Sequence, residues 1–139
     1  MNSTIDDLMV PDVVVISPDT TVAEARTHML RGGIHSLPVV NERGAPVGMV
    51  TSTDLMADCP SDAPVEQVMT RGVFTVPRYA DAHVAARVMH NHKLHHVVVT
   101  HEQRVVGILS SFDLLRLVEE HRFVMKNPPT PPRRSPRRA

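Results

Sequence analysis

The sequence predicts an α/β fold in which two similar βαββα halves pack on each other as one module with pseudo-two-fold symmetry. Three observations indicate this fold: short β-branched segments alternate with helical segments, one motif occurs twice, and the residues around it recur at a constant offset. The motif is GMVTSTD at 48–54 and GILSSFD at 107–113. Because two copies are too few for a solenoid, we expect two packed halves.

Each copy of the motif combines an apolar strand, a hydroxyl residue where the strand stops, and an aspartate three residues later. The hydroxyl residues are Thr51 and Ser110, and the aspartates are Asp54 and Asp113. This order places both side chains at a helix N-terminus, where free backbone N–H groups favour anionic oxygen. One copy alone would be interpreted as a capping box. Because the motif is duplicated, we also interpret it as a place for a ribose phosphate.

The repeat extends well beyond the motif. The offset between partners is 60 residues and falls to 59 at the motif, which indicates that the loop between Thr100 and Gly107 is one residue shorter than its partner loop between Val40 and Gly48. The recurring pairs are Ile5 and Val65, Leu8 and Val68, Met9 and Met69, Val22 and Ala82, Ala25 and Ala85, Met29 and Met89, and Ile34-His35 and Leu94-His95.

We place the first half, with its leader, at residues 1–59. The apolar spacing and turn residues predict a leader turn at 3–9, a strand buried on both faces at 13–16, and a helix that Thr21 caps and Gly32-Gly33 ends. Two strands follow at 37–40 and 46–50, joined by a hairpin-type loop, and then a short helix from 52 to about 57.

The second half, at residues 60–125, follows the same course after a Pro- and Asp-containing linker. We expect a leader turn at 65–69, strands at 73–76, 97–100 and 105–109, a helix from about 80 to 90, and a closing helix from 111 to about 123. Residues 126–139 form a Pro/Arg-rich tail that we expect to be disordered or polyproline-like. The tail has arginines but no interleaved aromatic residues, which argues against nucleic acid as a partner. A solubilising role, a PxxP ligand or contact with an acidic partner remain alternatives.

Composition excludes several classes of protein. The chain has 139 residues, 42% of them hydrophobic, and no run of the roughly 18 apolar residues that a membrane helix needs. Its single cysteine, Cys59, cannot form an internal disulfide, which favours a cytoplasmic location. The sequence supplies no assembled nucleophile and base, so we expect a protein that is not an enzyme.

The segments MVPDVVVISPDTTVAEA, GGIHSLPVV and PVGMVTSTDL resemble one CBS repeat, and VMTRGVFTV, KLHHVVV and VVGILSSFDLL resemble a second. Together they resemble a tandem CBS pair, or Bateman module, from about Ile5 to Glu120. Since only the tail lies outside the resemblance, we expect a stand-alone CBS-pair protein.

The resemblance implies a regulatory module that requires no cofactor and binds AMP, ADP, ATP or S-adenosylmethionine in clefts between the two repeats. It also implies that each cleft takes residues from both repeats. One site would combine Val14, Ile34 and His35 with Ser110, Phe112 and Asp113; the other would combine Phe74, Leu94 and His95 with Thr51, Thr53 and Asp54. His96 and Arg116 are further candidates for contact with phosphate.

The residue types suit such a ligand. An ionised aspartate can accept hydrogen bonds from both ribose hydroxyls, and apolar side chains can cover the faces of adenine. The two sites should be unequal, because Phe74 and Val98 stand where the first repeat has Val14 and Pro38. Occupancy of a single site, or of neither, is compatible with the resemblance.

Two alternatives from other classes remain. One is a ligand-free dimerising scaffold, and the other is a metal sensor built on HNHKLHH at 90–96, whose spacing matches no closed metal site and to which we assign no metal ligand. The resemblance implies a flat homodimer formed through the helices, and a regulated partner protein is possible. The apolar helix positions that we expect to exceed the needs of one intramolecular interface are Val22, Met29, Met89, Leu114, Leu117 and Val118.

Overall fold

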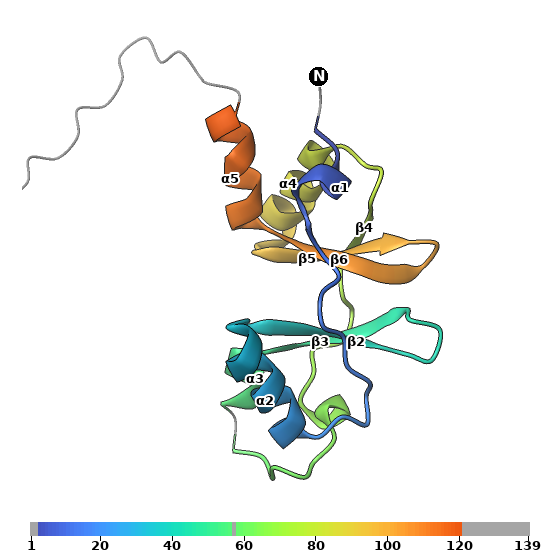
Figure 1. The fold of residues 1–139 in the computed structure, drawn as a ribbon, viewed down its shortest axis with the longest axis vertical. Helices are drawn as coiled ribbons and strands as arrows, with labels where there is room; N and C mark the ends of the chain where they lie inside the picture. The colour runs from blue at the N-terminus through green and yellow to red at the C-terminus, as the bar shows by residue number, and fades with distance from the viewer. Residues whose placement is uncertain (1–2, 57, 121–139) are drawn as a thin grey trace, which may run out of the picture.

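A computed structural model describes residues 3–56 and 58–120, which form two stacked layers (Figure 1). One layer contains the two-stranded antiparallel sheet β2 (Ser36–Val40) and β3 (Pro46–Thr51). The other contains a four-stranded sheet in the order β1-β6-β5-β4. The two sheets face each other, and the helices lie mainly on their outer sides (Figure 1). The predicted α/β fold of two packed repeats is therefore confirmed.

The first repeat folds as its capping and turn residues predict. Helix α2 (Val22–Gly32) begins where the Thr21 side chain accepts a hydrogen bond from the Glu24 N–H, and it ends at Gly33, whose φ of 60° suits glycine. Its buried face packs on β2 and β3, and α3 (Ser52–Leu55) follows directly after β3. The helix therefore covers the outer side of this sheet.

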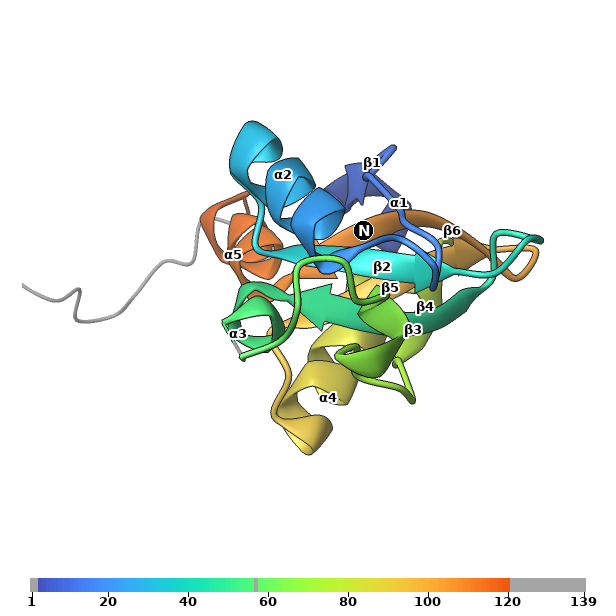
Figure 2. The same cartoon turned by 90° about the horizontal axis from the view of Figure 1, so that it is seen from below.

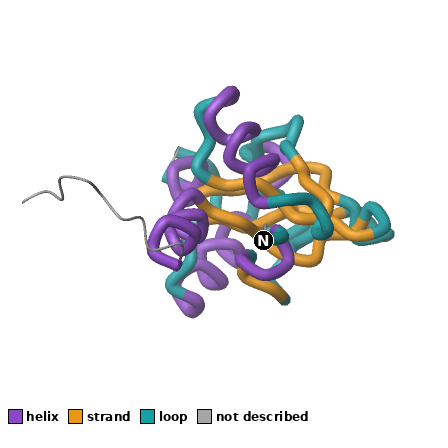
Figure 3. The backbone as a smooth tube through the Cα atoms, turned by 90° about the horizontal axis from the view of Figure 1, so that it is seen from above, coloured by secondary structure: helices purple, strands orange, loops and turns teal. Residues whose placement is uncertain are grey.

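The second repeat has the same sequence of elements. It contains β4 (Thr75–Pro77), α4 (Ala82–His92), β5 (His96–His101), β6 (Arg104–Ser110) and α5 (Ser111–Glu120). Figure 2 shows α2 and α4 on opposite sides of the sheets and α3 and α5 at one end, an arrangement that agrees with the expected pseudo-two-fold symmetry. Figure 3 shows the helices gathered toward that end.

The leader segments are exchanged between the repeats. Helix α1 (Ile5–Leu8) precedes the first repeat, yet Ile5 and Leu8 lie in the core of the second, and the Ile5 N–H donates to the Ala80 carbonyl at 2.9 Å. In return, the 3₁₀-helix η1 (Val65–Gln67) buries Val65 in the core of the first repeat. Each core is therefore completed by the leader of the other sequence repeat.

The glycine that opens each motif lies where a leader crosses the sheet. A Cβ atom at Gly107 would approach the Met9 sulfur and the Val10 carbonyl oxygen to 2.7 Å, and one at Gly48 would approach the Met69 sulfur to 2.5 Å. β1 (Val10–Pro11) pairs antiparallel with β6 at this point. The glycines thus permit the close approach that holds the exchanged leaders in place.

The predicted strand at 13–16, expected to be buried on both faces, is wrong. Only Ile16 is buried and bridges a strand, at Val39, whereas Val14 and Val15 are 43% and 41% exposed. The segment runs from β1, which pairs with β6 in one layer, to Ile16 beside β2 in the other, so residues 13–15 have no strand beside them. The β-branched run therefore connects the layers and lines a cleft.

Smaller differences concern ends and surfaces. Helix α4 begins and ends two residues later than predicted, because Asp81 takes the N-cap position. Of the six apolar helix positions expected to exceed the needs of one interface, Val22, Met29 and Met89 are buried in their own cores, Leu114 and Leu117 pack partly on one, and Val118 is exposed. The predicted end of the closing helix at 123 and the tail at 126–139 lie outside the described residues. Between 3 and 56 and between 58 and 120, no helix is long and apolar enough to cross a membrane.

Candidate functional site

Two clefts lie between the repeats, and each takes residues from both. The first, here called the Val14 cleft, has a volume of about 430 Å³. The first repeat contributes the turn at 10–14 and residues 34–36, and the second contributes residues on β5, β6 and α5. Its lining residues are Val10, Pro11, Asp12, Val13, Val14, Gly32, Ile34, His35, Ser36, His96, Ile108, Ser110 and Asp113.

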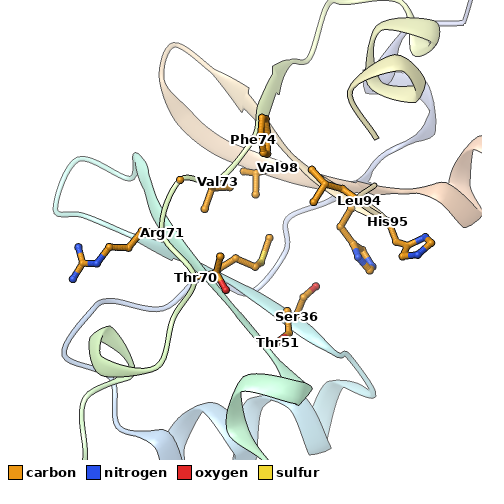
Figure 4. Close-up of a pocket in the computed structure, with 12 residues that line it drawn as sticks. Ser36, Thr51, Thr70, Arg71, Val73, Phe74, Leu94, His95 and Val98 are labelled. Atoms are coloured by element: carbon orange, nitrogen blue, oxygen red, sulfur yellow. The ribbon is translucent and has the colours of Figure 1, made fainter. Parts of the chain in front are cut away.

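The second cleft, here called the Phe74 cleft, has a volume of about 380 Å³ and is drawn in Figure 4. The contributions are reversed, because the turn and the residues before β5 now come from the second repeat. Its lining residues are Ser36, Met49, Thr51, Thr70, Arg71, Gly72, Val73, Phe74, Leu94, His95, His96 and Val98. Both volumes lie in the usual range of small-molecule sites.

The structure brings together most of the residues assigned to each site from the sequence. Val14, Ile34, His35, Ser110 and Asp113 meet in the Val14 cleft, and Thr51, Phe74, Leu94 and His95 meet in the Phe74 cleft. His96 lines both. The others do not line either cleft: Thr53, Asp54, Phe112 and Arg116, of which Phe112 is 77% exposed.

The duplicated motif forms a capping box in both repeats. The Ser110 N–H donates to Asp113 Oδ2 at 2.8 Å, and the Asp113 N–H donates to Ser110 Oγ at 3.1 Å. Thr51 and Asp54 make the same pair of bonds at 2.9 and 3.3 Å. A carboxylate has two oxygens, so Asp113 can cap its helix and still accept a hydrogen bond from a ligand in the Val14 cleft.

Backbone hydrogen bonds fix His35 and His95, the residues that directly precede β2 and β5. The Ser52 N–H donates to the His35 carbonyl at 2.9 Å, and the Ser111 N–H donates to the His95 carbonyl at 2.8 Å. The start of α3 is thereby tied to the residue before β2, and the start of α5 to the residue before β5. Each tie holds a motif hydroxyl and a histidine at the same end of the sheets.

His96 lies at the boundary between the clefts. Partial burial lowers its pKa from the ordinary value of 6.5, neighbouring His95 and His35 lower it further, and Asp113 acts in the opposite direction. The imidazole is therefore mainly neutral at pH 7 and can offer one donor and one acceptor. Its equivalent in the first repeat is Ser36, which also lines both clefts.

An aromatic pair stiffens the wall of the Phe74 cleft. The Phe74 and His92 rings stack with centroids 4.1 Å apart and planes inclined by 28°, so Phe74 is supported by the C-terminal turn of α4. The Val14 cleft has an aliphatic side chain at the equivalent position. The bulk of Phe74 accords with the smaller volume of its cleft.

Sequence reasoning missed the turns that enter the clefts. Asp12 and Gly72 both adopt positive φ, 53° and 72°, and the neighbours Pro11 and Arg71 line the clefts with them. Asp12 and Gly72 are related by the same 60-residue offset as the other pairs. The repeat therefore carried a signal for the turns: both residues lie inside the segments that resemble a CBS repeat, although neither was assigned to a site.

The histidine-rich segment does not converge on one point. His92 stacks on Phe74, His95 and His96 line the clefts, and His90 lines a groove between α4 and α5. Within the described part of the chain, no group of three or more His, Cys, Asp or Glu side chains could hold a metal ion.

Comparison with known proteins identifies the family. The CBS domain model matches residues 5–60 and 65–120. The inosine-5′-monophosphate dehydrogenase of Methanocaldococcus jannaschii is 31% identical over 112 residues, 80% of this chain and 23% of the relative. The chain therefore spans about a quarter of the length of that relative.

Solved structures show the same fold. The CBS domain pair of protein MJ0100, in complex with 5′-methylthioadenosine and S-adenosyl-L-methionine, has a TM-score of 0.78 and 27% identity, covering 88% of this chain and 100% of that one. Hypoxic Response Protein I, solved with two coordinated zinc ions, has a TM-score of 0.73 and 25% identity, covering 82% and 98%. With both repeats matched by the family model and the fold shared with a solved pair, the chain belongs to the CBS domain family and contains two CBS domains in tandem.

Proposed function

We propose that the CBS pair is a regulatory module that binds adenosine-containing ligands, among them AMP, ADP, ATP or S-adenosylmethionine, in the two clefts. The general part of this proposal, a regulatory ligand-binding module rather than a catalytic domain, follows from the family. The observation that supports adenosine compounds as the ligands is the Val14 cleft, where apolar side chains, a histidine and the Ser110–Asp113 pair surround about 430 Å³.

The lining of the Val14 cleft suits the parts of adenosine. Val14, Ile34 and Ile108 offer apolar walls for a flat base, and Asp113 offers a carboxylate oxygen for ribose hydroxyls. The structure of the MJ0100 pair was solved with two adenosine compounds, which supports the same ligand class here. The Phe74 cleft has Thr51 at its wall, but Asp54 does not line it, so its contact with ribose would differ.

The proposal includes a homodimer, a cytoplasmic location and an unidentified protein that responds to the ligand. The apolar side chains exposed on α2 and α5 and just after α3 support dimerisation, because unpaired apolar helix surfaces commonly form oligomer contacts. They are Leu30, Met56, Phe112, Leu115 and Val118, with exposed fractions from 54% to 84%. Cys59 is a free thiol, which fits a reducing compartment.

The test is calorimetric titration of the full chain with AMP, ADP, ATP and S-adenosylmethionine. For any of these compounds that occupies the Val14 cleft, which Asp113 lines, we expect Asp113→Ala to weaken binding by about 1.5–3 kcal/mol, the scale of a hydrogen bond to a charged group. Asp7→Ala is the matched control, because Asp7 also accepts from the N-cap residue of its helix, Thr4, but lines neither cleft. This control should lose stability while keeping its affinity.

Two results would contradict the proposal. One is equal affinity of wild type and Asp113→Ala for every compound that binds, which would leave Asp113 as a helix cap alone. The other is that none of the four compounds binds or raises the melting temperature, which would favour the ligand-free scaffold. Zinc and nickel belong in the same thermal series, because stabilisation by metal alone would favour the metal sensor.

A further inference from the structure

The turn that enters each cleft carries opposite charge in the two repeats. Pro11-Asp12 enters the Val14 cleft, and the equivalent Arg71-Gly72 enters the Phe74 cleft. The backbone is similar, because Asp12 and Gly72 have φ of 53° and 72°. The difference between the turns therefore lies in the side chains, an acid on one and a base on the other.

The Val14 cleft is acidic. Asp12 and Asp113 line it, and its lining as described contains neither lysine nor arginine. Arg78 lines the neighbouring pocket with Asp12, but its Nε and Nη2 both donate to Asp6 Oδ1, at 3.0 and 2.7 Å. A phosphate in this cleft would share it with two lining carboxylates of the same sign of charge, which disfavours its binding.

The Phe74 cleft has the opposite balance. Arg71 lines it, and none of its lining residues is an aspartate or glutamate. Figure 4 shows the Arg71 side chain directed away from His95, toward the outside of the cleft. There Arg71 Nη2 lies 3.4 Å from Glu66 Oε1, and the two side chains are 68% and 50% exposed, so their attraction is weak. A ligand phosphate could replace Glu66, because a guanidinium binds phosphate strongly.

We propose that the two clefts sort adenosine ligands by charge. The Val14 cleft takes an adenosine that carries a neutral or cationic group, such as a thioether or sulfonium, and the Phe74 cleft takes an adenosine phosphate. This inference rests on the proposed function, since it presupposes that adenosine compounds bind. It adds the ligand class of each cleft and the residues that set it, Asp12 and Arg71.

Calorimetry with two charge-removing variants tests the sorting. Asp12→Asn keeps a residue that tolerates positive φ, and Arg71→Gln keeps most of the side chain length. Asp12→Asn should weaken the binding of S-adenosylmethionine by about two- to fivefold, which is the scale of a partly exposed charge pair. The same variant should leave the affinity for AMP unchanged. Arg71→Gln should weaken the binding of AMP by about the same factor and leave the affinity for S-adenosylmethionine unchanged. Asp62→Asn and Arg87→Gln, exposed charges outside both clefts, are the matched controls.

Each contrary result is distinct. If either variant weakens AMP and S-adenosylmethionine equally, or neither variant affects its own ligand, the charge sorting is overturned while adenosine binding stands. If wild type binds S-adenosylmethionine but not AMP, the assignment of phosphate to the Phe74 cleft is overturned. If wild type binds neither compound, nor 5′-methylthioadenosine, both this inference and the proposed function fail.

Discussion

The two repeats agree in their cores and differ in their clefts. Each core has a helix with buried small and apolar residues, an antiparallel pair of strands and an exchanged leader. On the cleft walls, by contrast, Phe74 stands in the second repeat where the first has Val14, and His96 stands where the first has Ser36. The entry turn carries an acid in the first repeat and a base in the second. Packing restricts the core positions, because a change of side-chain volume in a close-packed core lowers stability. Cleft positions are not restricted in this way and can differ in chemistry. The differences therefore accord with our proposal that the two clefts bind unlike ligands on one scaffold.

The test with the largest expected effect concerns the exchanged leaders. Ile5 is fully buried in the core of the second repeat, so Ile5→Ala should lower the free energy of unfolding by about 2–5 kcal/mol. Val10→Ala, on the same leader but 52% exposed, should change it by less than about 0.5 kcal/mol. Urea unfolding followed by circular dichroism measures both. Equal small effects would mean that the leader does not complete the core of the second repeat.

A second test compares the two motif glycines. Gly107→Ala should cost about 1–3 kcal/mol, because the new Cβ would lie 2.7 Å from the backbone oxygen of Val10. Gly48→Ala should cost less, because its closest neighbour is the flexible Met69 side chain and the nearest backbone oxygen, that of Thr70, is 3.1 Å away. Thermal unfolding of the two variants side by side measures the difference. The reverse order would contradict the idea that backbone contact is tighter in the second repeat.

A third test concerns the helix pairs. Arg26 on α2 donates from Nη2 to the Leu55 carbonyl at 2.8 Å and so joins α2 to α3, whereas the equivalent Ala86 lines an open groove of about 540 Å³ between α4 and α5. Arg26→Ala should therefore cost about 1.5 kcal/mol, the lower end of the scale for a hydrogen bond to a charged group, because the bond is only partly buried. Arg31→Ala, an exposed arginine on the same helix, is the control. A loss no greater than that of the control would show that the bond does not hold the helices together.

The predictable part of the fold is the part that local sequence decides. The cap at Thr21, the stop at Gly33 and the duplicated hydroxyl–aspartate motif mark the helices and the order of elements. The exchange of leaders was not predicted, because it depends on which core a short apolar segment reaches in three dimensions. The run at 13–16 was misassigned for the same reason, since β-branched residues favour strands only where a neighbouring strand can pair with them.

The candidate site was predictable as far as the family motifs extend. Val14, Ile34 and Asp113 line a cleft as the resemblance implied, although their role in binding stays a prediction. Asp54 and Thr53 follow their motif just as closely but do not line the other cleft. Motifs record residue order, whereas lining a cleft depends on side-chain direction and on the turn that enters from the other repeat. Asp12 and Arg71, to which we attribute the difference in charge between the clefts, were therefore not among the predicted site residues.

The smallest expected effect concerns pH and the residue between the clefts. The pKa of His96 is lowered by partial burial and by its neighbours His95 and His35, so the unfolded chain binds a proton at this site more readily than the folded chain. The contribution of neutral His96 to stability is therefore present above pH 6.5 and is lost as the pH falls from 6.5 through the lowered value. His96→Ser, which makes this position equal to Ser36 of the first repeat, should flatten the pH dependence over that window. The effect is small, because His96 keeps substantial solvent exposure and Asp113 partly offsets the shift.

Melting temperatures of wild type and variant between pH 5 and pH 8 measure the difference, and His83→Ser, which replaces an exposed histidine on α4, is the control. If wild type and His96→Ser lose stability in parallel below pH 6.5, the boundary between the clefts does not sense pH.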